Sequence, residues 1–81
     1  MNLIFRTMII PAQIKAARAI LDMTQARLAE MAGISKTALI YIEAGKDPKA
    51  STLDRIQKSL ESLGVEFTNG EKPGVRLTKA P

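Results

Sequence analysis

Helical spacing of apolar residues recurs along this chain only over short stretches, and residues that start or stop helices bound each stretch. Pro11 suits a first helical position, and Gly33, Gly45 and Gly64 suit the turn that follows a helix end. The pattern predicts helices over residues 11–22, 25–31, 36–44 and 52–63. With 81 residues the chain forms one domain, and its thin core depends on good packing between these helices.

Short polar residues precede three of the predicted helices. Thr24 and Ser35 stand where a side-chain oxygen accepts a hydrogen bond from the first turn. Ser51 is followed three positions later by Asp54, which is the pattern of a capping box, so we expect the fourth helix to be capped by Ser51. That helix carries an apolar stripe made of Leu53, Ile56, Leu60 and Leu63.

Both ends of the chain differ from the helical middle. In residues 65–78 apolar and polar residues alternate around Asn-Gly and Pro-Gly pairs, which predicts two short strands or a hairpin with a long turn. Residues 1–10 form an extension or a short strand, with Met8 as an alternative start. We therefore expect a mainly α fold with an extension (1–10), a helical domain (11–64) and a β-like tail (65–81).

The composition argues against catalysis. The chain has neither cysteine nor histidine, so it lacks a disulfide, a thiolate metal site and the commonest general base. We expect no metal, no cofactor and no enzymatic activity. The net charge of +4 is compatible with a polyanionic partner. The apolar start is too short to span a bilayer and lacks the features of a signal peptide, so we expect a cytoplasmic protein without a membrane partner.

The most informative stretch is residues 24–46, TQARLAEMAGISKTALIYIEAGK, where two short helices are joined through a turn that contains Gly33. In the second helix Leu39 and Ile42 point to one side, with Ala38 at the edge. The opposite side carries Lys36, Thr37, Ile40, Tyr41 and Ala44. This arrangement matches a helix-turn-helix, whose second helix enters the major groove of DNA.

The same stretch resembles the XRE family, the Cro- and lambda-repressor-like helix-turn-helix proteins. The residues that carry the resemblance are T-Q-x-x-L-A-x-x-A-G-I-S-K-T-x-L-x-x-I-E-x-G-K, within a match that runs from about Pro11 to Leu63. The resemblance implies a lambda-repressor-like bundle of four to five short helices. It also implies a dimer that binds a palindromic operator in double-stranded DNA.

The resemblance also implies roles for individual residues. Arg18 and Glu43 match a structural ion pair between the first and third helices. The predicted contacts to DNA phosphates come from Gln25, Ser35, Lys46 and Lys49. The predicted base-reading residues are Lys36, Thr37, Ile40 and Tyr41. An exposed Ile40 suits either a thymine methyl group or a protein contact.

The leading hypothesis is therefore a sequence-specific, double-stranded DNA-binding transcriptional regulator of the repressor kind. The alternative is a protein-interaction module or antitoxin subunit with the same fold, bound to a partner such as a toxin. Residues 65–78 need a surface to lie on, because an isolated hairpin is marginal in water. That surface is either the helical core or the same segment of a second chain, and we expect a homodimer with the tail at its interface.

Overall fold

The computed structural model describes residues 9–69 and 71–78. Over these residues the chain forms four helices and one antiparallel hairpin, which confirms the predicted mainly α fold with a C-terminal β segment. The elements are α1 (Pro11–Leu21), α2 (Gln25–Ala32), α3 (Lys36–Glu43), α4 (Ala50–Glu61), β1 (Val65–Thr68) and β2 (Gly74–Leu77). Of the predicted extension or short strand over residues 1–10, residues 1–8 with the alternative start at Met8 lie outside the described residues, and Ile9 and Ile10 form no strand.

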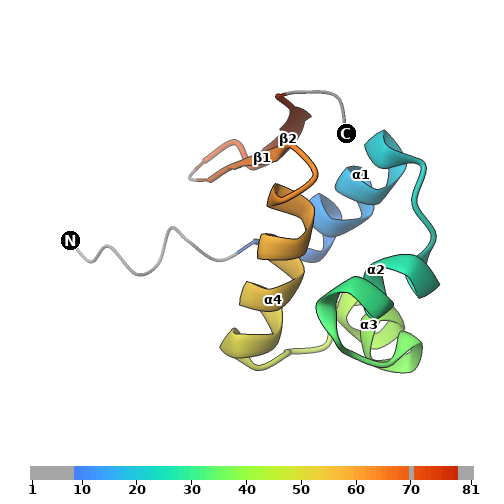
Figure 1. Ribbon diagram of the computed structural model, residues 1–81. Coiled ribbons are helices and arrows are strands. Elements are labelled where there is room, and N and C mark those ends of the chain that lie inside the picture. Colours follow the sequence, from blue (N-terminus) through green and yellow to red (C-terminus); the bar gives the residue numbers. More distant parts are fainter. Residues whose placement is uncertain (1–8, 70, 79–81) are drawn as a thin grey trace.

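The helices pack around a core to which each of them contributes. Helices α2 and α3 form the helix-turn-helix at one end of the molecule, α4 packs against α2, and the hairpin lies at the other end (Figure 1). The largest fully buried side chains are Ile14, Leu28, Leu39, Ile56 and Leu60. Since these positions follow the helical period, the apolar stripes predicted from the sequence are the stripes that the bundle buries. No helix in the described part of the chain has the length and apolarity needed to cross a bilayer.

Side chains cap two of the predicted helix starts. The Thr24 hydroxyl oxygen accepts a hydrogen bond from the backbone N–H of Arg27 at 3.1 Å, and that of Ser35 accepts one from Ala38 at 3.0 Å. Each bond satisfies a backbone donor that the first helical turn leaves without a partner. The starts of α2 and α3 were therefore readable from the sequence.

The predicted cap of the fourth helix is wrong. Helix α4 begins at Ala50, with Lys49 at the cap position and no side-chain cap bond, so Ser51 lies inside the first turn. Alanine is the best helix former, and Ala50 starts the helix one residue before Ser51. Asp54 does not complete a capping box but forms an exposed ion pair with Lys58 at 3.2 Å.

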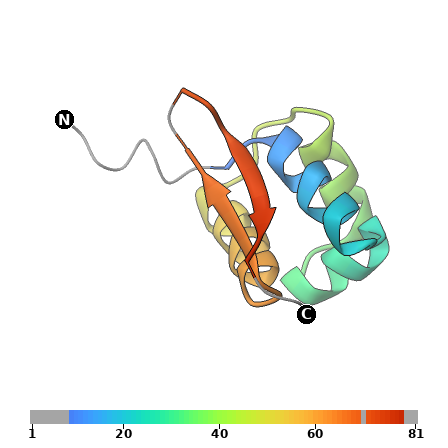
Figure 2. The same cartoon turned by 90° about the horizontal axis from the view of Figure 1, so that it is seen from above.

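The hairpin lies on the helices of its own chain. Strands β1 and β2 pair with Val65 opposite Leu77 and Thr68 opposite Gly74. Seen from above, the hairpin covers α4 and runs beside α1 (Figure 2). Val65 is buried, and the next inward-facing residues, Phe67 and Val75, pack against the core. Of the two surfaces considered for the tail, the structure uses the helical core.

Gln13 of α1 fastens the hairpin to the start of that helix. Its amide nitrogen donates to the carbonyl oxygens of Thr68 at 2.8 Å and Gly74 at 3.0 Å, and its amide oxygen accepts from the Ile10 N–H at 2.9 Å. With 3% of its surface exposed, Gln13 is buried with both ends of its amide satisfied. Sequence reasoning did not identify this contact.

Candidate nucleic-acid interface

Helix α3 exposes one face to solvent, and this face carries both polar and apolar side chains. Its inward residues Leu39 and Ile42 are buried in the core, as the helical spacing predicts. The four predicted base-reading residues, Lys36, Thr37, Ile40 and Tyr41, are all exposed. Ile40 and Tyr41 retain 39% and 57% of their accessible surface, and they are neighbours on this one face of the helix.

The turn between α2 and α3 fixes the direction of this surface. Gly33 has a φ of +72°, in the left-handed region that glycine tolerates best. The N–H of Ile34 then bonds back to the Ala29 carbonyl at 3.0 Å, which closes the helix end in the Schellman manner. Ala29 and Ala32 are buried small residues that let the two helices approach closely. Because Ser35 caps α3 directly after this turn, the angle between the helices is set by local bonds.

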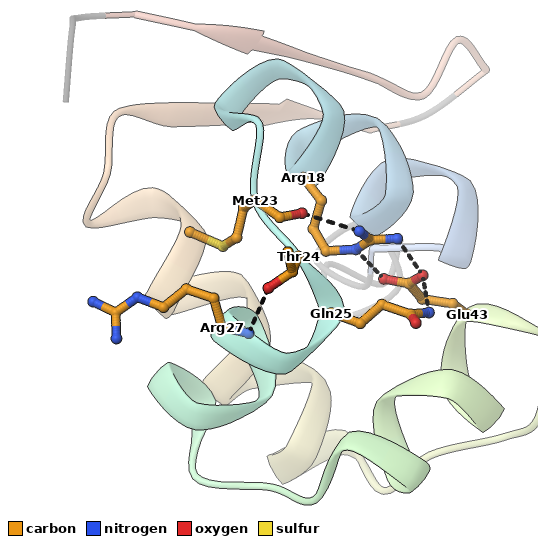
Figure 3. A network of polar contacts seen from close by, with 6 residues as sticks. All are labelled: Arg18, Met23, Thr24, Gln25, Arg27 and Glu43. Atoms are coloured by element: carbon orange, nitrogen blue, oxygen red, sulfur yellow. Dashed lines mark hydrogen bonds and ion pairs between the residues drawn. The ribbon is translucent and has the colours of Figure 1, made fainter.

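A buried polar network holds the far end of α3 against the first two helices. The Arg18 guanidinium donates from Nε to Glu43 Oε2 at 2.7 Å and from Nη2 to Glu43 Oε1 at 2.8 Å. Its remaining nitrogen, Nη1, donates to the Met23 carbonyl at 3.0 Å. Gln25 Nε2 donates to Glu43 Oε1 at 3.0 Å (Figure 3). Glu43 thus joins α3 to α1 and α2 by accepting three hydrogen bonds.

Burial and charge act in opposite directions on Glu43, whose side chain is 3% exposed. Burial alone raises the pKa of its carboxyl group. The hydrogen bonds from Arg18 and Gln25 and the charges of Arg18 and Lys15 lower that pKa by more than burial raises it. The net pKa lies below the ordinary value of 4.5. The hydrogen bond with Glu43 also raises the pKa of Arg18, so both groups stay charged at neutral pH.

The structure shows a contact of Gln25 that the sequence did not indicate. One N–H of its amide is directed at Glu43, inside the network. An amide NH2 group has two hydrogens, so the second remains for another acceptor. The contact of Gln25 with a DNA phosphate stays a prediction. Gln25 and Glu43 are 18 positions apart in the sequence, so no pattern of neighbouring residues predicts this hydrogen bond.

The loop between α3 and α4 adds basic residues beside the exposed surface of α3. Lys46 and Lys49, both predicted to contact phosphates, are exposed, as is Ser35 at the start of α3. A shallow hollow lies between α3, this loop and α4. It is lined by Ala38, Tyr41, Ile42, Lys46, Asp47, Pro48, Lys49 and Thr52. Sequence reasoning missed Pro48 and Thr52, because a hollow between two helices has no signature within either helix.

The described residues contain no cluster of acidic side chains that could hold a metal ion. What the arrangement offers is a helix with an exposed face, positioned by a cap, a tight turn and a buried ion pair. Basic residues stand beside that helix. Such a surface suits recognition of a polyanion by shape and hydrogen bonding.

Comparison with known proteins agrees with this geometry. None of the curated proteins matches the chain. A family model described as helix-turn-helix matches residues 14–67, which cover most of α1, all of α2, α3 and α4, and most of β1. Proteins of this family are DNA-binding regulators. The chain belongs to the XRE-type helix-turn-helix family.

Proposed function

We propose that this protein is a sequence-specific regulator of transcription that binds double-stranded DNA as a repressor. The observation that carries the proposal is the exposed row of Lys36, Thr37, Ile40 and Tyr41 on a helix that a buried network holds in place. A major groove about 12 Å wide admits one α-helix. Helix α3 inserts there with its exposed row toward the base pairs.

The residues of this row differ in what they recognise. Lys36 donates hydrogen bonds to guanine, the commonest target of a basic side chain in the major groove. Thr37 reads a neighbouring base edge, and Ile40 contacts a thymine methyl group. Ser35, Lys46, Lys49 and the second N–H of Gln25 contact phosphates and fix the register of the helix.

Two copies bind a palindromic operator as a homodimer, because one helix of eight residues reads only a short site. The hairpin offers the surface for this association. Leu77, which lies opposite the buried Val65 near the open end of the hairpin, retains 37% of its surface, and both strands of a two-stranded sheet are edge strands that can pair with another chain. Repression then follows from occupancy of the operator.

Truncation of the hairpin is an unsuitable test of the dimer, because it removes the buried Val65 from the core. Leu77→Lys instead changes a side chain that is already 37% exposed and keeps Val65 in the core, and circular dichroism checks that the variant is folded. Sedimentation should show the wild type as a dimer and Leu77→Lys as a folded monomer. Asn69→Lys, in the exposed turn of the hairpin, is the matched control and should remain dimeric. A wild-type monomer at high micromolar concentration contradicts this part of the proposal.

Selection of bound duplexes from a random DNA pool tests the function directly. The wild type should enrich a palindromic sequence, and Lys36→Ala should change the preferred base at one position of each half-site, at a cost of about 1–3 kcal/mol. Lys58→Ala is the control, since Lys58 is paired with Asp54 on the surface of α4. An unchanged preference in Lys36→Ala would exclude its base-reading role.

The alternative function, a protein-interaction module or antitoxin subunit, is favoured by the exposure of Ile40 and Tyr41. Large apolar side chains on a surface are also what a protein partner buries. The two functions differ in their salt dependence. Phosphate contacts make the affinity for duplex DNA fall steeply with salt, whereas an interaction module shows neither binding nor a slope.

A further inference from the structure

The hollow beside α3 divides the four predicted base-reading residues into two groups. Residues four positions apart lie one above the other on a helix. Lys36 and Ile40 therefore form one line along the helix, Thr37 and Tyr41 a second, and Ala38 and Ile42 a third. Of the four predicted base-reading residues only Tyr41 lines the hollow, together with the third line. Tyr41 therefore stands on the flank of α3 that faces α4 and the preceding loop.

The flanks of a recognition helix meet a different part of DNA from its centre. A helix with its side chains is about 10–12 Å across, and the major groove is about 12 Å wide. The helix fills the groove, so its centre faces base edges and its flanks face the sugar–phosphate walls. A side chain on the flank that borders the loop of residues 46–49 lies against such a wall.

We propose that the hollow between α3 and α4 seats one deoxyribose–phosphate unit of the operator, and that Tyr41 positions the DNA backbone instead of reading a base. This inference rests on the proposed function, and it assigns a ligand to the hollow beside Tyr41, for which that function gives no role. Tyr41 differs in this from Lys36, Thr37 and Ile40, which keep their base-reading roles.

The lining of the hollow has the chemistry of such a unit. Ala38, Pro48 and the Tyr41 ring provide apolar surface for the C–H groups of the sugar. Thr52 and Tyr41 carry hydroxyl groups, which are common donors to phosphate oxygens. Lys46 and Lys49 supply positive charge at the same hollow.

One lining residue opposes the proposed ligand. Asp47 brings a carboxylate to the same hollow, and a carboxylate repels a phosphate. If DNA occupies the hollow, Asp47→Asn must strengthen binding, on the selected operator and on unrelated duplexes alike. The sequence selected by Tyr41→Ala then separates a Tyr41 that positions the backbone, which leaves the preference unchanged, from one that reads a base, which changes it.

The test uses the full chain and the duplex that the wild type enriches from the random pool, beside an unrelated duplex of equal length. Dissociation constants are measured over a salt series for the wild type, Tyr41→Ala, Tyr41→Phe and Asp47→Asn. Lys58→Ala is the control, and circular dichroism checks that each variant is folded. The selection is then repeated with Tyr41→Ala.

We expect Tyr41→Ala to lose about tenfold in affinity, as one good contact does, by the same factor on both duplexes and with an unchanged selected sequence. Tyr41→Phe should lose less, and Asp47→Asn should gain about threefold at low salt, with the gain shrinking as salt screens the charge. A changed preference in Tyr41→Ala, or no gain in Asp47→Asn, overturns this inference and leaves the proposed function standing. Failure of the wild type to enrich any duplex overturns the proposed function and this inference together.

Discussion

Glu43 and Gln13 are the two buried polar side chains of the described residues, and they hold opposite ends of the molecule. Glu43 accepts hydrogen bonds from Arg18 and Gln25 and fixes the helix that faces the proposed operator. Gln13 donates to backbone carbonyls and fixes the hairpin. One site is charged and joins side chains, whereas the other is neutral and joins a side chain to the main chain.

The difference shows how each kind of site depends on its partners. A buried carboxylate is strongly unfavourable without a counter-charge, so Glu43 requires Arg18 in particular. A buried amide requires only hydrogen bonds, and any backbone carbonyl can supply them. The charged site should therefore be the more sensitive to mutation and to pH, and the neutral site the more local in its effects.

The largest effect is expected from Arg18→Ala. It leaves Glu43 as a buried charge without its partner, at a cost of about 3–5 kcal/mol in the free energy of unfolding. Lys15→Ala removes an exposed charge on the same helix that also favours ionised Glu43 but makes no hydrogen bond to it, so its effect should stay within about 0.5 kcal/mol. Urea denaturation measures both. Equal midpoints for the two variants would show that the ion pair does not stabilise the fold.

Gln13→Ala should have the next largest effect, about 1–3 kcal/mol, because it removes the three hydrogen bonds that this buried amide makes with Ile10, Thr68 and Gly74. The loss of stability in Gln13→Ala should be confined to the hairpin. Hydrogen exchange should become faster at the amides of Glu66 and Arg76 in the hairpin and stay unchanged in α3. A uniform increase over both regions would contradict the separation of the two sites.

Acid should weaken the charged site and leave the neutral one intact. The pKa of Glu43 is lower in the folded chain than its ordinary value of 4.5, so its contribution to stability is present above that pH. The contribution is lost as the pH falls through the lowered pKa of the folded state. When the pH is lowered below about 4.5, the denaturation midpoint of the wild type should therefore fall. The midpoint of Glu43→Gln, which is already less stable at neutral pH, should fall less over the same pH range. Parallel curves for the two proteins would refute this assignment.

The smallest effect concerns the helix caps. Ser35→Ala removes the acceptor for the Ala38 N–H and should cost about 1 kcal/mol. Ser51→Ala should stay within about 0.5 kcal/mol, because Ser51 lies in the first turn of α4 and makes no cap bond. Thermal denaturation of the two variants compares them, and an equal loss in both would restore Ser51 as a cap.

Local spacing in the sequence determined the parts of this protein that depend on neighbours along the chain. The caps of α2 and α3, the turn at Gly33 and the two faces of α3 follow from residues three or four positions apart. The alternating tail likewise predicted its own strands. The resemblance to a family supplied the pairing of Arg18 with Glu43, which no spacing would suggest.

The tertiary structure decided what joins distant segments. Gln13 meets Thr68 and Gly74 across 55 and 61 positions, and the amide of Gln25 turns to Glu43 across 18. The hollow beside Tyr41 exists only because α4 and its loop pack against α3. A sequence pattern records which face of a helix is apolar, since that depends on a fixed local period. Which polar partner that helix meets depends on how all the helices and the hairpin pack around the core, and no single segment of the sequence determines that packing.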